Sequence, residues 1–252
     1  MFWIVDHPRP FFAVLLLVLL ATVEMGFRIR GHRGSSVDED RHKQVEGTRN
    51  DIAVLLSLLL GFTLAMALVR FDQRTDLVID EANAISTARL RAEMLPELSR
   101  GPAQEAVRRY IEARAQYSRA RPGQEMERAL AQSNEAQQEL WRSATLAAQQ
   151  DRSAITALFI ASLNQSFDLK DKRVATLEHR IPGSLWFMLV FIALLTCFTV
   201  GWSHRRRLLQ SMAVPPLAIA LVMMLIADLD TSRSGLIRVR QQSIERLQSE
   251  TK

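Results

Sequence analysis

Residues 181–203 read IPGSLWFMLVFIALLTCFTVGWS, a run of 23 residues without one charged side chain. At a rise of about 1.5 Å per residue, a helix of this length reaches about 34 Å, and the hydrocarbon core of a bilayer is about 30 Å thick. A second uncharged run, residues 208–227, follows after only His204-Arg205-Arg206-Arg207. So short a connection predicts two antiparallel membrane-spanning helices.

The N-terminal part of the chain holds two further apolar runs. Residues 52–69 carry no charge, and residues 10–23 are uncharged and continue past Glu24 to Phe27. Residues 1–9 contain Asp6 and a single arginine, and no small-x-small cleavage site follows, so we expect a retained span rather than a signal peptide. The predicted spans are therefore about 10–27, 52–69, 181–203 and 208–227.

The segment between the two pairs of runs, residues 70–180, is polar and helical in pattern. Residues 70–95 lack glycine and proline, which predicts that the second span continues out of the bilayer as one long helix ending at Pro96. Asn50-Asp51 is expected to cap the start of that span. Further helices are expected from Gly101-Pro102 onward, over 124–150, and from the apolar stripe of Ile155, Phe159, Leu163 and Phe167 on to Glu178.

These patterns predict an all-α fold with four transmembrane helices in two pairs and a helical polar insert between the second and third. We expect four regions: a first transmembrane pair in 1–69, an extramembrane domain in 70–180, a second transmembrane pair in 181–229, and a polar C-terminal tail in 230–252. The expected location is the cell inner membrane, with the lipid bilayer as the first partner.

Composition excludes several classes of function. The net charge is +5, but the insert mixes 17 basic with 16 acidic residues and has no basic stripe, so nucleic-acid binding is not expected. The single cysteine, Cys197, allows no intrachain disulfide and no cysteine-based metal site. Glu39 and His42 have Glu-x-x-His spacing only once and in an expected loop, so no metal site is predicted. No catalytic motif occurs, and we predict neither an enzyme nor a cofactor.

Two features of the apolar runs are candidates for function. Glu24 is the ionisable residue inside an apolar run, which suggests an intramembrane acid for proton or ion handling. The alternative is that its side chain reaches the interface. In the second span Ser57, Gly61 and Thr63 are small or weakly polar and could line a pore, although small residues also favour close helix packing.

Charged residues beyond the spans form two candidate gating or structural networks. The first lies two to three turns past the second span: Asp80, Glu81 and Asn83, with Arg91 or Arg89 as possible partners. In an oligomer its acids could form a ring that acts on ions. The second follows the fourth span: Asp228, Asp230 and Arg238, with Arg70 or Arg74 as possible partners. A solvated face or a structural ion pair is the alternative for both.

The ordered set of these elements resembles the bestrophin-like family of bacterial multi-pass membrane proteins, a domain-of-unknown-function family. The elements, in chain order over about residues 45–245, are Asn50-Asp51, Gly61, Asp80-Glu81-Ala82-Asn83-Ala84-Ile85, Leu95-Pro96, Tyr110, Asp228-Leu229-Asp230 and Gly235-Leu236-Ile237-Arg238-Val239. The chain departs from the family pattern at residues 231–234, which lack the usual proline. The resemblance to bestrophins implies an oligomeric anion channel with the helical insert in the cytoplasm.

Charge asymmetry points to the opposite orientation. The two connecting loops carry nine Lys plus Arg residues and the two termini carry six, so the positive-inside rule predicts cytoplasmic loops and an insert outside. Orientation therefore stays open at this stage.

Two classes of function also stay open. The first is a homo-oligomeric anion pore with the second span as its lining. The second is a membrane-anchored sensor or scaffold whose helical insert binds a partner protein.

Overall fold

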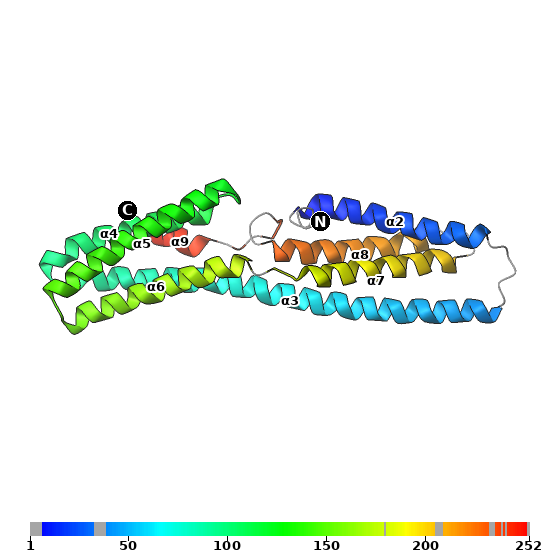
Figure 1. The fold of residues 1–252 in the computed structure, drawn as a ribbon, viewed down its shortest axis with the longest axis horizontal. Coiled ribbons are helices and arrows are strands. Elements are labelled where there is room, and N and C mark those ends of the chain that lie inside the picture. Colours follow the sequence, from blue (N-terminus) through cyan, green and yellow to red (C-terminus); the bar gives the residue numbers. More distant parts are fainter. Residues whose placement is uncertain are drawn as a thin grey trace. The chain divides into compact units, whose positions relative to one another are not determined.

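A computed structural model of the chain describes residues 7–32, 39–178, 180–204, 209–231, 235–237, 239 and 241–250. This described part is all-helical and contains no strand, as predicted. Its eight helices (Figure 1) are α2 Pro8–His32, α3 Glu39–Glu93, α4 Glu97–Arg119, α5 Gln124–Gln150, α6 Ala154–Glu178, α7 Gly183–Ser203, α8 Leu209–Asp230 and α9 Gln242–Ser249.

Four of these helices are long and apolar enough to cross a membrane, judged by length and composition. They are the helices over Pro8–Gly31, Glu46–Glu93, Gly183–Ser203 and Met212–Asp230. Each of them overlaps one of the four apolar runs from which spans were predicted.

Several local predictions need correction. Asn50 does not cap a helix, because α3 begins eleven residues earlier at Glu39, and for the same reason Glu39 and His42 lie in a helix and not in a loop. The side chains of Glu39 and His42 are outside the described part. Helix α4 begins at Glu97 and not at Gly101, since the backbone N–H groups of Ser99 and Arg100 both donate to the Pro96 carbonyl at 2.9 Å.

Contacts divide the chain into two compact units. Unit 1 comprises residues 1–71 and 180–238, and unit 2 comprises residues 72–179 and 239–252. The C-terminal tail, expected only to be polar, contains α9. That short helix belongs to unit 2, where Ile244 and Leu247 are buried.

Unit 1 is held together by close helix packing. Helices α2 and α7 approach so closely that a Cβ added at Gly201 would lie 1.9 Å from the Val23 carbonyl oxygen, and one at Gly26 would lie 2.3 Å from that of Phe198. Because glycine has no Cβ, it alone permits this contact. The core between the helices is mostly aliphatic and includes Leu19, Leu189, Ala193, Met223 and Ala227.

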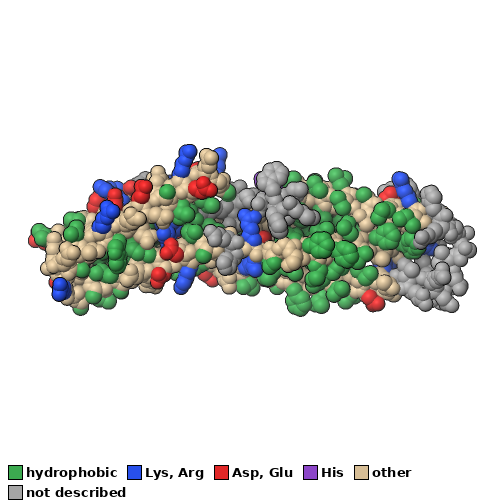
Figure 2. Space-filling model, viewed as in Figure 1, with side chains coloured by type: hydrophobic (Ala, Val, Ile, Leu, Met, Phe, Trp, Pro, Cys, Tyr) green, Lys and Arg blue, Asp and Glu red, His purple; other side chains and the backbone are tan. Residues whose placement is uncertain are grey.

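The outer surface of unit 1 is also apolar. Large hydrophobic side chains are exposed on its helices, among them Leu17, Val54, Phe62, Phe187 and Leu221. On the face shown in Figure 2, hydrophobic side chains gather over the helices of unit 1, whereas acidic and basic side chains are spread over those of unit 2. An apolar exterior is what a lipid environment requires.

Unit 2 has a core of small and aromatic side chains. Many of its buried positions are alanines, which allow the helices to approach closely, and larger buried side chains fill the remaining space. The larger members include Tyr110, Leu140, Phe159, Leu163 and Phe167. The Tyr110 and Phe167 rings meet edge to face, with centroids 5.6 Å apart.

Candidate functional site: a buried ion-pair cluster and an exposed helix face

The core of unit 2 contains one carboxylate between two guanidinium groups. Glu81 of α3 accepts hydrogen bonds from Arg114 Nε of α4 and, at 2.6 Å, from Arg173 Nη1 of α6. The side chains of Glu81 and Arg114 are fully buried, and that of Arg173 is 4% exposed. The cluster therefore joins α3, α4 and α6.

The remaining donors of the two arginines reach further parts of unit 2. Arg114 Nη1 donates to Ser133 Oγ at 3.2 Å, and Arg173 Nη2 donates to Ser118 Oγ at 3.3 Å and to the side chain of Gln241. The ring of Tyr117 lies 4.6 Å from the Arg114 guanidinium and 5.8 Å from that of Arg173. Such contacts between a cation and the face of a ring stabilise buried positive charge.

The electrostatic balance of the cluster favours an ionised Glu81. Burial, the largest single effect, would raise the pKa of its carboxyl group, but the attraction and hydrogen bonds of Arg114 and Arg173 together hold that pKa below its usual value. Two guanidinium charges face one carboxylate, so the cluster carries one excess positive charge.

Sequence reasoning selected Glu81 but missed both partners. Arg89 and Arg91, the partners considered from the sequence as one alternative, bond elsewhere: Arg89 to Glu93 at 3.2 Å and Arg91 to the Leu158 carbonyl at 2.7 Å. A usable signal existed for Arg173. The apolar stripe of α6 through Phe159 and Leu163 continues at helical spacing to that residue, so an arginine occurs on the buried face.

The other predicted residues of the first network lie outside the core. Asp80 and Asn83 are exposed, whereas Glu81 is buried. The Asn83 carbonyl accepts the Thr87 hydroxyl at 3.0 Å. The structure therefore separates Glu81 from its two neighbours in the predicted network.

The second network binds backbone amides. Asp228 is buried, and its carboxylate accepts the N–H groups of Leu236 at 2.6 Å and Ile237 at 2.8 Å. Asp230, also buried, accepts the N–H of Ile181 at 3.1 Å. Both acids thus fix the chain next to the ends of α7 and α8. Arg238 lies outside the described residues.

The three candidate pore residues lie on two different faces of α3. Ser57 and Gly61 are exposed in the protomer, and apart from the neighbouring backbone of α3 no atom lies within 4 Å of a Cβ added at Gly61. Thr63 is buried, with 2% exposure, and its hydroxyl donates to the Leu59 carbonyl at 2.7 Å. Leu56, Leu60 and Ala67 share the buried face with Thr63 at alternating steps of four and three residues.

Glu24 lies near the C-terminal end of α2 and forms an ion pair with Arg28 at 2.7 Å. Its side chain is 33% exposed, and that of Arg28 is 68% exposed. The pair spans one helical turn.

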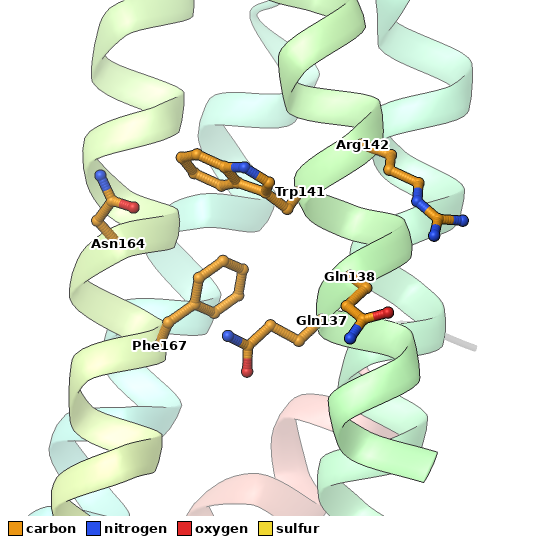
Figure 3. Close-up of a pocket in the computed structure, with 6 residues that line it drawn as sticks. All are labelled: Gln137, Gln138, Trp141, Arg142, Asn164 and Phe167. Carbon is orange, nitrogen blue, oxygen red and sulfur yellow. The ribbon is translucent and has the colours of Figure 1, made fainter. Parts of the chain in front are cut away.

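Unit 2 also has an open surface pocket of about 430 Å³ between α5 and α6 (Figure 3). Its lining combines aromatic rings, carboxamides and one guanidinium: Gln137, Gln138, Trp141, Arg142, Asn164 and Phe167. In Figure 3 the rings of Trp141 and Phe167 lie next to each other, whereas the Arg142 side chain points away from them. No group of His, Cys, Asp and Glu side chains suited to a metal ion occurs within the ranges that the structure describes.

The chain was compared with curated proteins and with solved structures. No curated protein matches the chain. Two crystal structures of a bacterial bestrophin homologue from Klebsiella pneumoniae share the fold. The one with a tyrosine-to-alanine mutation has a TM-score of 0.65 at 12% identity, covering 94% of this chain and 96% of that one. The one with an isoleucine-to-threonine mutation has a TM-score of 0.64 at 13% identity, covering 95% and 98%.

A family model confirms the resemblance drawn from the sequence elements. The model of the Bestrophin-like domain matches residues 12–244, which is most of the chain. The chain therefore belongs to the Bestrophin-like family.

Proposed function

We propose that the chain is the subunit of a homo-oligomeric membrane channel that conducts anions, with α3 along the conduit. The observation that carries the proposal is the two-sided character of α3 in unit 1. One face, with Leu56, Leu60 and Thr63, packs into the unit, whereas the face with Ser57 and Gly61 is exposed. In a homo-oligomer, which the bestrophin resemblance implies, this exposed face would lie against a second copy of the chain or along the conduit.

In this proposal the four apolar helices cross the membrane as two pairs, over about residues 10–27, 52–69, 181–203 and 208–227. Residues 70–180 form the helical extramembrane domain between the pairs, and the tail from residue 230 joins it through α9. The cell inner membrane is the proposed location, and the lipid bilayer surrounds the apolar exterior of unit 1.

The exposed face of α3 in the membrane segment suits a weakly interacting conduit. Residues 52–69 contain no charged side chain, so an ion would meet apolar groups, one serine hydroxyl and the exposed backbone of Gly61. A conduit of this kind lets ions pass without holding them tightly. Glu81 does not offer a negative charge there, because its carboxylate is buried and neutralised by two guanidinium groups.

The charge of the conducted ion has arguments on both sides. The bestrophin resemblance supports anions. Against it, Asp72, Asp76 and Asp80 are exposed on one side of α3 at four-residue steps, and carboxylates that faced the conduit would attract cations.

Reconstitution of the purified protein in a planar bilayer tests both the channel activity and the selectivity for anions. We expect discrete single-channel currents whose reversal potential follows the chloride gradient. Currents that follow the cation gradient would keep the channel and overturn the anion assignment. Absence of current across salts and pH values would contradict the channel itself.

Orientation is tested separately. We propose a cytoplasmic helical domain, as the bestrophin resemblance implies, so alkaline phosphatase fused to the C-terminus is expected to be inactive. Active enzyme there would support the opposite orientation, which the distribution of Lys and Arg favours.

A sensor or scaffold is the second candidate function. The specific observation in its favour is the open pocket of unit 2, where Trp141 is 42% exposed beside three carboxamide side chains. A partner protein bound specifically by the full chain in detergent, and lost in the Trp141→Ala variant, would support this function.

A further inference from the structure

Among the polar atoms of unit 2 that lack a hydrogen-bond partner in the described part of the chain, three belong to side chains of α4 and α6 in its core. They are Arg114 Nη2, Tyr110 Oη and Ser166 Oγ. All three side chains are almost completely buried, with exposures of 0%, 1% and 1%. A buried polar group that lacks a partner destabilises the fold, and more so if it is charged, so three in one core require an explanation.

The three atoms belong to one neighbourhood. Tyr110 precedes Arg114 by four residues on α4, which places both side chains on the same face of that helix. The Tyr110 hydroxyl interacts with the Ser166 hydroxyl of α6, although the two do not form a hydrogen bond of good geometry, and it lies in the field of the Arg114 guanidinium. Burial raises the pKa of Tyr110 well above its usual value, so its phenol keeps its proton and can donate it.

The chemistry of the set selects the class of ligand. A guanidinium N–H can only donate, and the phenol and the aliphatic hydroxyl, which can donate or accept, can each turn a proton toward the same ligand. The adjoining ion-pair cluster has two guanidinium groups and one carboxylate, so the neighbourhood has one excess positive charge. Another buried cation, Lys170 of α6, is already engaged by Asp171 at 3.1 Å and by Asn134 and Gln137 at 2.7 Å each.

We propose that Arg114, Tyr110 and Ser166 form a binding site for a small monatomic anion, a halide, in the core of unit 2. Arg114 Nη2 supplies the charged donor, and the two hydroxyls complete the coordination from α4 and α6. The anion compensates the excess charge of the Glu81 cluster and ties α4 to α6. This site is separate from the proposed conduit along α3, and it acts on the stability of the helical unit.

The test measures thermal unfolding of the full-length protein in detergent, in sodium chloride or bromide against sodium methanesulfonate at constant ionic strength. We expect the halides to raise the Tm in a saturable manner. Tyr110→Phe and Ser166→Ala each remove one hydroxyl donor and keep the packing. Because a hydrogen bond to a charged group contributes about 1.5–3 kcal/mol, each variant should weaken apparent halide affinity about ten- to a hundredfold.

Ser162→Ala is the matched control. Ser162 is also a buried serine of α6, one turn earlier, but its hydroxyl already donates to the Phe159 carbonyl at 2.7 Å. Its variant should keep the halide affinity of the unaltered protein. A bromide soak should give an anomalous peak next to Arg114.

Three results would overturn the site. Equal stabilisation by all salts would show that no specific anion is bound. Unchanged halide dependence in both Tyr110→Phe and Ser166→Ala would place the anion elsewhere. A water molecule at this position in bromide-soaked crystals would assign the three donors to hydration. None of these readouts depends on ion conduction, so failure of the channel proposal would leave the test intact.

Discussion

Replacing Glu81 with glutamine should destabilise unit 2 strongly. The substitution keeps the size of the side chain but removes the one negative charge between Arg114 and Arg173. Two guanidinium groups, exposed by no more than 4%, would then repel each other without a counter-charge. The carboxamide would also replace an acceptor-only group with one that has two N–H donors of its own.

The expected size follows from the burial of all three side chains. Removing one partner of a buried ion pair typically costs about 3–5 kcal/mol, because the other charge is left uncompensated. For a chain of 150–250 residues, 1 kcal/mol corresponds to about 2–4 °C in Tm, so Glu81→Gln should lower Tm by about 6–20 °C. Differential scanning calorimetry of the purified protein in detergent measures this shift.

Asp80→Asn is the matched control, because it makes the same chemical change at the neighbouring exposed position. A surface substitution of this kind should stay within about 0.5 kcal/mol, or about 2 °C. If Glu81→Gln shifts Tm no more than Asp80→Asn, the ion-pair cluster does not stabilise the fold and the reasoning fails.

The same carboxyl group predicts a pH dependence. Its pKa is held below the usual value of 4.5 in the folded protein by the two arginines. A lowered folded-state pKa contributes stability that is present above the unfolded-state pKa and is lost as pH falls through the folded-state value. The Tm difference between the unaltered protein and Glu81→Gln should therefore be constant from about pH 8 to pH 5 and shrink below about pH 4.5. A difference that grows toward low pH would contradict the assignment.

Three further predictions concern unit 1. Gly201→Ala should destabilise the protein by about 1–3 kcal/mol, because the new Cβ would lie 1.9 Å from the Val23 carbonyl oxygen. Gly61→Ala should not, because apart from the neighbouring backbone of α3 no atom lies within 4 Å of its new Cβ. Thermal unfolding in detergent compares the two variants. Asp228→Asn keeps one acceptor for two N–H groups and should speed amide hydrogen exchange at Leu236 and Ile237, and unchanged exchange would argue against this role. In a Cys197→Ser background, Ser57→Cys should react with a water-soluble thiol reagent and the reaction should alter the current. Thr63→Cys, at a position 2% exposed, should not react. Reaction at residue 63 but not at residue 57 would exclude the proposed orientation of α3.

The helical architecture could be predicted because it depends on local patterns. An uncharged run of about 20 residues has few alternatives to a membrane-length helix, and no glycine or proline between residues 62 and 95 interrupts α3 past its apolar segment. Errors occurred where local signals were ambiguous. Asn50 resembles a helix cap, but the polar residues before it are also good helix formers, and α3 includes them.

The candidate site could be predicted only in part. Glu81 was selected from its position beyond the span, and Ser57, Gly61 and Thr63 from their small or weakly polar side chains. Which of these residues face the core could not be decided from chain position, because an α-helix turns by about 100° per residue and its partner faces are set by packing. Thr63 is consequently buried while Ser57 and Gly61 are exposed.

The amino-acid sequence by itself determined that the chain is helical, that it has four membrane-length apolar helices, and that it resembles the bestrophin-like family. These properties reside in runs of neighbouring residues. Only the tertiary structure decided that Glu81 pairs with Arg114 and Arg173, which lie 33 and 92 residues away along the chain. The same holds for the meeting of Tyr110, Arg114 and Ser166 in one core. Ion pairing and donor clustering depend on distances in space, and in a helical unit those distances are fixed by which faces of distant helices pack together.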